Sequence, residues 1–205
     1  MPRISVIVPS YSHERCVAES IQSVLDQTYE DFEIIITDDG STDGTVREIR
    51  KFRDTRIKRF CFEKNQGACV AANNCLKEAS GEYIAMLSSD DAFLPDKLEK
   101  QVTFLDRHPE TAAVFGYAEM IDEDGNKFTD ETHFYYNIFN QPNRNRHEWL
   151  HYFFYKQNCL CHPSVLIRKK CYEDIGSYDE RLAQLPDFDF WVRLSLKYKD
   201  RKSVV

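Results

Sequence analysis

Three clusters of aspartate side chains in this sequence could bind a cation, because each brings two carboxylates together beside an apolar segment. The clusters are Asp38-Asp39, Asp90-Asp91, and Asp187 with Asp189. Ionised carboxylates side by side repel each other unless water, hydrogen-bond donors or a cation compensate. A divalent metal with a phosphate group behind it is therefore the first functional hypothesis. The alternative is a set of solvated turns and helix caps, where Asp is favoured.

Apolar periodicity predicts that strands and helices alternate through the first half of the chain. Strands are expected over 3–8, 32–37, 57–62 and 83–87, and helices over 14–27, 45–52, 68–79 and 95–107. We expect Pro9 to end the first strand. This alternation predicts an α/β fold with a parallel sheet. The first two acidic clusters would then share one edge, because ligands bind at the carboxyl ends of parallel strands.

The second half of the chain has a less regular pattern. Strands are expected over 112–117 and 164–168, an irregular strand over 118–127, and helices over 147–155, 169–175 and 186–198. Residues 128–145 are rich in Asn and aromatic side chains, among them Phe134, Tyr135, Tyr136 and Phe139. A long segment without a clear period is typical of a functional loop, but the rings could equally pack together.

The length of 205 residues predicts a single domain over 1–205. Because Val204-Val205 begins a new apolar segment, we expect the chain to be cut from a longer protein. The composition, 42% hydrophobic and 30% charged, is ordinary for a soluble globular protein. No apolar run approaches the ~18–20 residues that a membrane span needs. The net charge of -7 argues against a nucleic-acid partner held by electrostatics.

The seven cysteines are scattered and form no CxxC pair. This pattern disfavours a disulfide framework and a structural zinc site, and free thiols suit a reducing cytoplasm. Cys159, Cys161 and His162 could be metal ligands, but the second half of a four-ligand site is missing. The sequence also lacks the GxGxxG, GxxxxGK[ST] and GxSxG motifs, which disfavours a dinucleotide site, a P-loop and a nucleophile elbow.

An ordered set of segments resembles family 2 glycosyltransferases with the GT-A fold. The set comprises residues 4–11 (Ile-Ser-Val-Ile-Val-Pro-Ser-Tyr), 27–29 (Gln-Thr-Tyr), 32–43 (Phe-Glu-Ile-Ile-Ile-Thr-Asp-Asp-Gly-Ser-Thr-Asp) and 80–84 (Ser-Gly-Glu-Tyr-Ile), followed by Ser89-Asp90-Asp91. The chain is similar to the single-domain type represented by a bacterial spore-coat polysaccharide enzyme. The resemblance implies a Rossmann-like α/β/α sandwich with a mostly parallel central sheet. It also implies an inverting transferase that uses a nucleotide-diphosphate sugar with Mn²⁺ or Mg²⁺.

The same resemblance implies which residues bind the nucleoside. Pro9, Ser10 and Tyr11 match the loop that receives it, with Tyr11 placed to stack on the base. A stacked ring adds affinity with little preference among bases; Tyr11 could instead be a core tyrosine. Asp39 matches the residue that accepts a hydrogen bond from the base, which leaves Asp38 a structural role.

The remaining carboxylates match the metal site and the catalytic base of the family. Asp90 matches the ribose-side residue and Asp91 the metal ligand, where a hard cation is held by carboxylates and two phosphates. Asp187 matches the catalytic base, a carboxylate that takes the proton of the acceptor hydroxyl. The usual Glu of this motif is Pro186 here, and Asp189 is a rival base. Either aspartate could also cap the last helix.

Departures from the family pattern put two contacts in doubt. Residues 65–74 resemble an Asn-x-Gly…Ala-Arg-Asn stretch, but Ala72 stands where Arg is common, so a phosphate or base contact is lost or supplied elsewhere. The Gln-x-x-Arg-Trp motif of processive members is absent, which disfavours polymer synthesis. His162-Pro163-Ser164 matches a segment that faces the sugar or acceptor, although a lone His is more often structural.

We therefore predict a glycosyltransferase that moves a sugar, with a UDP-sugar as the expected donor, to a hydroxyl of a glycan or lipid-linked acceptor in cell-surface polysaccharide synthesis. A cytoplasmic location, with peripheral association at the inner face of the membrane, would fit such an acceptor. Two alternatives stay open: a non-catalytic sugar-nucleotide-binding domain of a larger enzyme, and a sugar-phosphate nucleotidyltransferase. The latter normally needs a Gly- and Arg-rich loop after the first strand, which residues 9–12 lack.

Overall fold

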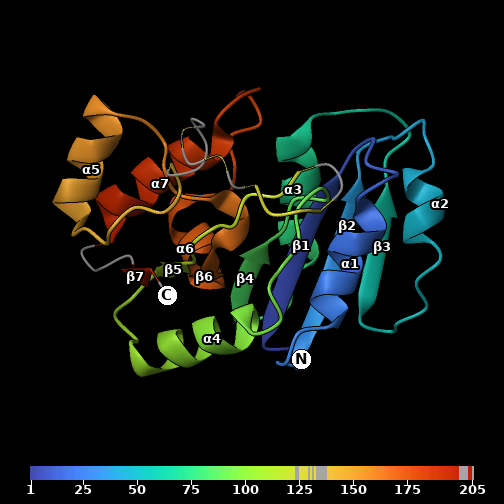
Figure 1. The fold of residues 1–205 in the computed structure, drawn as a ribbon, viewed down its shortest axis with the longest axis horizontal. Helices are drawn as coiled ribbons and strands as arrows, with labels where there is room; N and C mark the ends of the chain where they lie inside the picture. Colours follow the sequence, from blue (N-terminus) through green and yellow to red (C-terminus); the bar gives the residue numbers. More distant parts are fainter. Residues whose placement is uncertain (123–124, 129, 131, 133–137, 199–202, 205) are drawn as a thin grey trace.

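One mixed sheet organises the chain. The computed structural model describes residues 1–122, 125–128, 130, 132, 138–198 and 203–204. Within them, seven strands follow the order β3-β2-β1-β4-β6-β5-β7 (Figure 1). The strands are β1 (Ile4–Ser10), β2 (Phe32–Asp38), β3 (Ile57–Cys61), β4 (Tyr83–Met86), β5 (Ala113–Phe115), β6 (Leu166–Arg168) and β7 (Ser203–Val204). The helices are α1 (Val17–Leu25), α2 (Thr45–Ile49), α3 (Ala68–Glu78), α4 (Lys97–Arg107), α5 (Arg146–Tyr155), α6 (Lys169–Ile175) and α7 (Pro186–Lys197), with a 3-10 helix at His162–Ser164.

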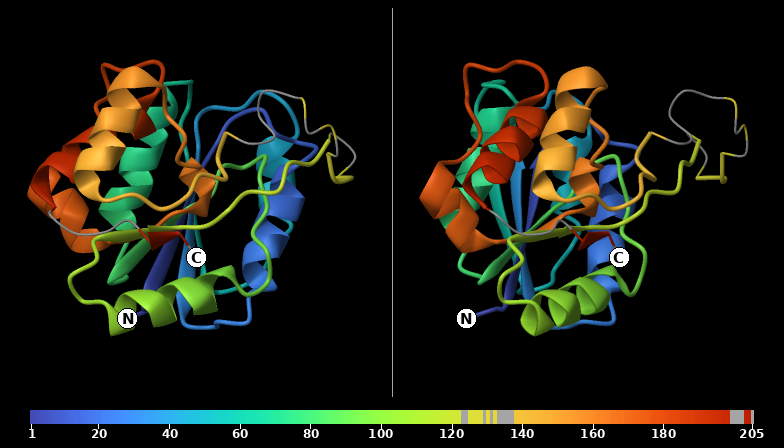
Figure 2. Two further views of the ribbon diagram at one scale, coloured as in Figure 1. Left: turned by 60° about the vertical axis from the view of Figure 1, so that its left-hand side comes forward. Right: turned by 90° about the vertical axis from the view of Figure 1, so that its left-hand side faces the viewer.

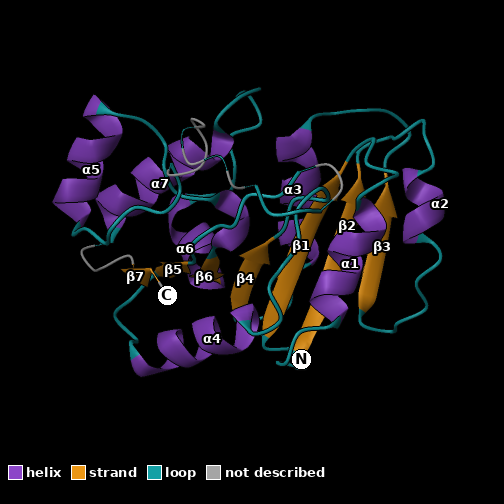
Figure 3. Cartoon of the chain, in the orientation of Figure 1, coloured by secondary structure: helices purple, strands orange, loops and turns teal. Residues whose placement is uncertain are grey.

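The predicted parallel sheet is confirmed for β1 to β4, which form one half of the molecule (Figure 3). The register pairs Ile4 with Phe32 at the start of β1 and β2, and Ser10 with Asp38 at their ends. The loops that follow these two strands therefore leave from the same edge of the sheet. Parallel pairing of β4 with β1 brings the third loop, which carries the second acidic cluster, to that edge as well.

The other half of the sheet is mixed. β6 runs antiparallel to both β4 and β5, and β7 runs parallel to β5. The short strand β7, which pairs Ser203 with Val114, was not predicted from the sequence. Parallel pairs still outnumber antiparallel ones in the described sheet, so the expected mostly parallel α/β architecture is confirmed.

Helices cover both faces of the sheet, as the predicted sandwich requires (Figure 2). On one face, α3, α5, α6 and α7 pack against strand residues such as Ile7 and Ile35. On the other, α1 and α4 pack against residues such as Val6 and Ile34. Because both faces are buried, β2 is buried at every position, which explains why its sequence is a continuous apolar run rather than an alternating one.

The expectation that Pro9 ends the first strand is wrong. β1 continues through Pro9 to Ser10, whereas its neighbour β4 pairs no further than Met86 with Ile7. The Ile7 carbonyl accepts from the Leu87 amide, so Pro9, two residues on, faces the same side of the strand. That side is beyond the end of β4. The missing N–H of Pro9 therefore costs no hydrogen bond between strands.

The segment after β5 departs furthest from the predicted pattern. The irregular strand expected over 118–127 is reduced, in the described residues, to one bridge between Ile121 and Lys127. Phe134, Tyr135 and Tyr136 lie outside the described residues, so the role of the aromatic segment stays a prediction. Among the helices that the structure describes, none combines the length and the apolar character that a bilayer crossing needs.

Candidate active site

A cavity of about 420 Å³ opens at the carboxyl edge of the parallel strands. The loops after β1, β2 and β4 contribute to its wall together with the N-terminal part of α3. Side chains from the mixed half of the sheet close the opposite side. The sequence-predicted residues that line it are Pro9, Ser10, Tyr11, Asp39 and Asp90, and His162 lines it as well. Asp91 and Asp187 do not line the cavity themselves, but their neighbours Asp90 and Pro186 do.

Asp39 is fixed at the cavity wall by backbone amides. Its Oδ1 accepts from the Gln66 amide at 2.7 Å and its Oδ2 from the Gly67 amide at 2.9 Å. Gly40 makes this approach possible, because it has a positive φ of 73° and a Cβ there would lie 2.5 Å from the Lys64 carbonyl carbon. Each carboxylate oxygen retains acceptor capacity. A ligand N–H or O–H could therefore bind Asp39 without disturbing the loop.

The neighbouring Asp38 serves the loop and not the cavity. Its two carboxylate oxygens accept from the amide and the hydroxyl of Ser41, at 2.9 and 2.6 Å. The side chain is buried and does not line the cavity. Asp38 therefore fits the structural role that the resemblance left to it.

The loop after β1 offers a polar atom and a ring to a ligand. The Ser10 side chain is 3% exposed, and its Oγ has no hydrogen-bond partner in the part of the chain that the structure describes. A buried hydroxyl without a partner is unfavourable, so a ligand group at this wall would be stabilising. Tyr11 is 44% exposed at the cavity, which rules out the core tyrosine considered as its alternative role.

The second acidic cluster lies at the outer end of the cavity. Asp90 has an exposed carboxylate, and its Oδ2 lies 3.9 Å from the Nε2 atom of His13. His13 is held by a 2.7 Å hydrogen bond between its Nδ1 and Ser89 Oγ. The surrounding protein atoms, and next the charge of Asp90, raise the pKa of Asp91 above its ordinary value although its side chain reaches solvent. Among the described residues, no Lys or Arg forms an ion pair with either carboxylate, and His13 is the basic side chain beside them.

The cavity itself contains no cation. Among the described residues, no Lys or Arg lines it, and Ala72 occupies the wall where an Arg of the family pattern was expected. Nor do three His, Cys, Asp or Glu side chains come together as a complete metal site in the described ranges, which excludes a cluster built on Cys159, Cys161 and His162. Mg²⁺ and Mn²⁺ sites that hold phosphates commonly use only one or two carboxylates. The pair Asp90 and Asp91 fits that requirement.

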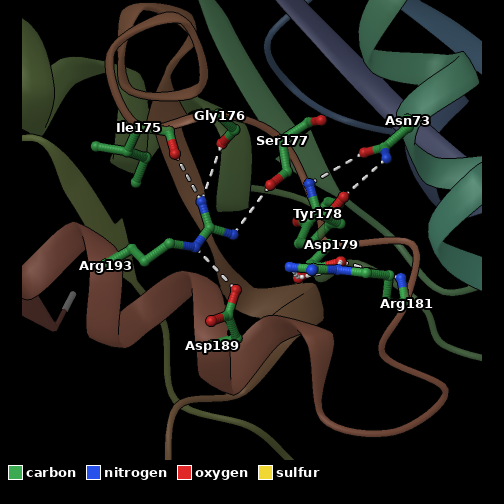
Figure 4. Close-up of polar contacts among 9 residues, drawn as sticks. All are labelled: Asn73, Ile175, Gly176, Ser177, Tyr178, Asp179, Arg181, Asp189 and Arg193. Carbon is green, nitrogen blue, oxygen red and sulfur yellow. Dashed lines mark hydrogen bonds and ion pairs between the residues drawn. The ribbon is translucent and has the colours of Figure 1, made fainter.

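The two candidate bases on α7 have different surroundings. Asp187 is half-buried, and its Oδ2 accepts from Asn158 Nδ2 at 2.7 Å. Asp189 Oδ2 instead accepts from Arg193 Nε at 2.8 Å, and the Arg193 guanidinium also donates to the carbonyl oxygens of residues 175–177 (Figure 4). Asp189 therefore ties α7 to the preceding loop, while Asp187 adjoins the cavity.

Neither aspartate caps α7, so the capping alternative is wrong. The N-cap is Leu185, with no side-chain cap, and Pro186 begins the helix. Leu185 has a positive φ of 54°, a conformation that costs a non-glycine residue about 1–2 kcal/mol. Strained backbone of this kind collects at functional sites, where surrounding structure enforces it. Here it directly precedes Pro186 at the cavity wall.

Sequence reasoning missed two residues that line the cavity, His13 and Tyr178. His13 has one signal, because it follows β1 in the loop that also carries Tyr11. Tyr178 has none: it lies in a loop and is positioned by Asn73 of α3, whose side chain donates to the Tyr178 carbonyl at 2.9 Å and accepts from its amide at 3.1 Å (Figure 4). Tyr178 in turn bonds His162, with 2.8 Å between its hydroxyl and Nε2.

Curated relatives match from about half to nearly all of the chain. An uncharacterized glycosyltransferase, MJ1057 of Methanocaldococcus jannaschii, is 32% identical over 196 residues, which covers 94% of this chain and 64% of the relative. The E. coli enzyme WfgD, described as a UDP-Glc:alpha-D-GlcNAc-diphosphoundecaprenol beta-1,3-glucosyltransferase, is 40% identical over 119 residues, 58% of this chain and 47% of the relative. The chain thus spans about two thirds or less of the length of these relatives.

Solved structures share the fold. The S. aureus TarS 1–349 complex with UDP-GlcNAc aligns with a TM-score of 0.77 and 25% identity, over 99% of this chain and 56% of that one. The mannosyltransferase PcManGT from Pyrobaculum calidifontis, in complex with GDP-Man and Mn²⁺, aligns with a TM-score of 0.72 and 18% identity, over 100% of this chain and 55% of that one. The profile of glycosyl transferase family 2 matches residues 5–176. The chain therefore belongs to glycosyl transferase family 2.

Proposed function

We propose that this chain is the nucleotide-sugar-binding and catalytic part of an inverting, metal-dependent glycosyltransferase that acts in cell-surface polysaccharide synthesis. The observation that carries the proposal is the charge of the cavity. Its wall includes Asp39 and Asp90 and, in the described residues, no Lys or Arg. An anionic diphosphate would be repelled there unless a cation accompanied it.

The nucleoside would bind at the β1 and β2 end of the cavity. Tyr11 presents an exposed ring for stacking, Ser10 an unpartnered buried hydroxyl, and Asp39 a carboxylate that can accept from a base. TarS binds UDP and UDP-GlcNAc with the same fold, which supports a UDP-sugar as donor.

The diphosphate would extend toward the second acidic cluster. Asp91, with Asp90 on the ribose side, would hold Mn²⁺ or Mg²⁺, and the cation would stabilise the charge that develops on the departing diphosphate. Their carboxylates adjoin each other, and the surrounding protein atoms and the charge of Asp90 raise the pKa of Asp91, which favours a bound cation at this place. The Mn²⁺ and GDP-Man bound by PcManGT support the same arrangement at the level of the fold.

Asp187 is the proposed base. An acceptor hydroxyl would give its proton to Asp187 while its oxygen bonds to the anomeric carbon and the bond from that carbon to the diphosphate breaks, with inversion. The Asn158 amide bonds Oδ2, and no described residue donates a hydrogen bond to Oδ1, which leaves that oxygen for the acceptor. Asp189 is already paired with Arg193, which favours Asp187 of the two.

The acceptor would be a glycan or lipid-linked sugar. The name of WfgD gives a diphosphoundecaprenol-linked acceptor for that relative, and this supports the same class here. Such an acceptor is presented at the inner face of the membrane, so we propose a cytoplasmic enzyme with peripheral membrane association. We also propose that residues 1–205 form a single domain.

Turnover of a UDP-sugar tests the proposal. With Mn²⁺ present, we expect sugar transfer or slow hydrolysis, and we expect Asp91→Ala to abolish both because the cation is no longer held. Retained turnover by Asp91→Ala in the presence of Mn²⁺ would contradict the metal role. Release of pyrophosphate from a nucleoside triphosphate plus a sugar phosphate would instead identify a nucleotidyltransferase.

One observation favours a second candidate function, a non-catalytic nucleotide-sugar-binding domain. Pro186 replaces an acidic residue beside the proposed base, after the strained Leu185. Metal-dependent binding of UDP without turnover of any UDP-sugar, measured on a full-length protein that contains this chain, would support that alternative.

A further inference from the structure

Two buried tyrosines and a histidine form a hydrogen-bonded chain that ends at the cavity. The hydroxyls of Tyr172 and Tyr178 are 3.1 Å apart, and the Tyr178 hydroxyl is 2.8 Å from His162 Nε2. Tyr172 on α6 is 7% exposed and does not line the cavity, whereas Tyr178 and His162 do. This series of hydrogen bonds therefore connects helix α6 to the wall of the cavity.

The number of hydrogens favours one direction for this series of hydrogen bonds. The Tyr172 hydroxyl has no other partner in the part of the protein that the structure describes, so its one hydrogen is satisfied only when it donates to Tyr178. Tyr178 then uses its own hydrogen to donate to His162 Nε2. The opposite direction would leave the buried Tyr172 O–H without an acceptor, which is the costlier arrangement.

With this direction, the imidazole of His162 is neutral and carries its proton on Nδ1. Nε2 must accept, so it carries no hydrogen, and the one proton of a neutral ring resides on the other nitrogen. Burial lowers the pKa of His162, an effect that the charge of Asp187 opposes, so the ring stays unprotonated at neutral pH. No described residue accepts from Nδ1.

Aromatic packing holds the three rings in place. Tyr172 stacks on Phe190 with 4.6 Å between ring centroids, and His162 contacts Trp191 edge-on at 5.6 Å. The backbone of Tyr178 is clamped by Asn73, as Figure 4 shows. These contacts restrict the rotation of the His162 ring.

We propose that Tyr172 and Tyr178 are positioning residues that hold His162 in the Nδ1–H tautomer, so that the imidazole offers a neutral N–H donor to an oxygen of the transferred sugar. This inference rests on the proposed function for the identity of the ligand, but not for the tautomer. His162 lies within electrostatic reach of Asp187. The sugar, rather than the diphosphate at the Asp90 end, is the part of the donor that must lie beside the base.

Nitrogen NMR of the free protein tests the tautomer without any ligand. In protein labelled with ¹⁵N-histidine, we expect the His162 signals of an Nδ1–H ring, assigned by their loss in His162→Asn. Tyr178→Phe removes the donor to Nε2, so we expect a shift toward the Nε2–H tautomer that free imidazole rings of histidine prefer. An Nε2–H ring in the wild type, or an unchanged ring in Tyr178→Phe, would overturn the inference.

Ligand binding tests the role toward the sugar. Tyr172 does not line the cavity, and Tyr172→Phe removes the hydroxyl that donates to Tyr178. We expect the UDP-sugar to bind about tenfold more weakly, with the affinity for UDP unchanged, because the hydrogen bond from His162 to the sugar is no longer favoured. Tyr198→Phe is a matched control, because it removes a tyrosine hydrogen bond to Asp174 instead. We expect Tyr198→Phe to leave both affinities unchanged.

The outcomes separate this inference from the proposed function. If Tyr172→Phe weakens the binding of UDP as much as that of the UDP-sugar, the His162 N–H contacts the diphosphate and not the sugar. If Tyr172→Phe weakens the binding of neither ligand, Tyr172 has no positioning role. Either outcome would overturn the proposal. If the tautomer is as inferred but no nucleotide sugar binds the wild type, the proposed function fails and the sugar contact with it. If Tyr172→Phe does not fold, the wild-type tautomer still decides the direction of the chain.

Discussion

The parallel and mixed halves of the sheet position their site residues in different ways. In the parallel half, Asp39 is held by the amides of Gln66 and Gly67, and its strand and turn are specified by adjacent sequence. In the mixed half, Asp187 and His162 are held by the side chains of Asn158 and Tyr178, which come from other loops. The proposed nucleotide end of the site is thus positioned by the sheet and its adjoining turns, whereas the proposed catalytic end depends on contacts between loops.

We expect the largest effect from a substitution in the mixed half, at the proposed base. We expect Asp187→Asn to lower kcat by about 10²–10⁴, the usual loss when a general base is removed, while the Kd for UDP stays unchanged. Steady-state kinetics and a binding titration measure the two quantities. The matched control is Asp189→Asn, which breaks the ion pair with Arg193 and should lower the melting temperature more than kcat. The reverse ranking of the two variants would assign the base to Asp189.

The next prediction concerns the parallel half. We expect Asp39→Asn to weaken UDP binding by about tenfold to a hundredfold, because a hydrogen bond to a charged acceptor contributes about 1.5–3 kcal/mol. Calorimetric titration measures this Kd. Asp38→Asn, which only alters the bond to Ser41, should reduce stability and leave that Kd unchanged. Equal Kd values for wild type and Asp39→Asn would remove Asp39 from the nucleotide site.

The sequence predicts the parallel half better than the mixed half, for a physical reason. Strands β1, β2 and β4 are largely apolar segments followed by loop residues, and the parallel pairing then brings the loops of Tyr11, Asp39 and Asp90 to one cavity. Each of those steps depends on local sequence. The family roles assigned to these residues remain predictions that the variants above test.

The mixed half lacks such local signals. Tyr178 lines the cavity in a loop whose backbone Asn73 of α3 holds, a contact between residues far apart in sequence. The strained N-cap Leu185 contradicts local propensity, and the two-residue strand β7 has too short a pattern to be detected. Tertiary contacts decide these features, so they could not be derived from spacing and composition.

The last prediction is a pH dependence of stability in the parallel half. Burial alone would raise the pKa of Glu33, but hydrogen bonds from Lys58, Ser5 and Ser80 lower it from 4.5 to about 2. A carboxylate whose pKa is lower in the folded state stabilises the fold at pH values above its unfolded-state pKa. This stabilisation is lost as the pH falls toward the folded-state pKa. Unfolding free energy should therefore drop by at most about 3 kcal/mol between pH 4.5 and 2 through this group.

Denaturant titrations across that pH range measure the effect. In Glu33→Gln, which cannot ionise, this component of the pH dependence should disappear, although the variant is less stable at neutral pH. An identical pH profile for wild type and Glu33→Gln would show that the buried network at the start of β1, β2 and β4 contributes no such stabilisation.

The central claim is that a nucleotide diphosphate binds this cavity through a cation at the second acidic cluster. The most direct measurement is the melting temperature of the protein with UDP, in Mn²⁺ and in EDTA, for wild type and Asp91→Ala. A ligand that binds only the folded state stabilises it by about 2.7 kcal/mol at a hundred times its Kd. We therefore predict that UDP clearly raises the melting temperature of the wild type in Mn²⁺ but not in EDTA. The same rise in EDTA, or in Asp91→Ala with Mn²⁺, would contradict the claim.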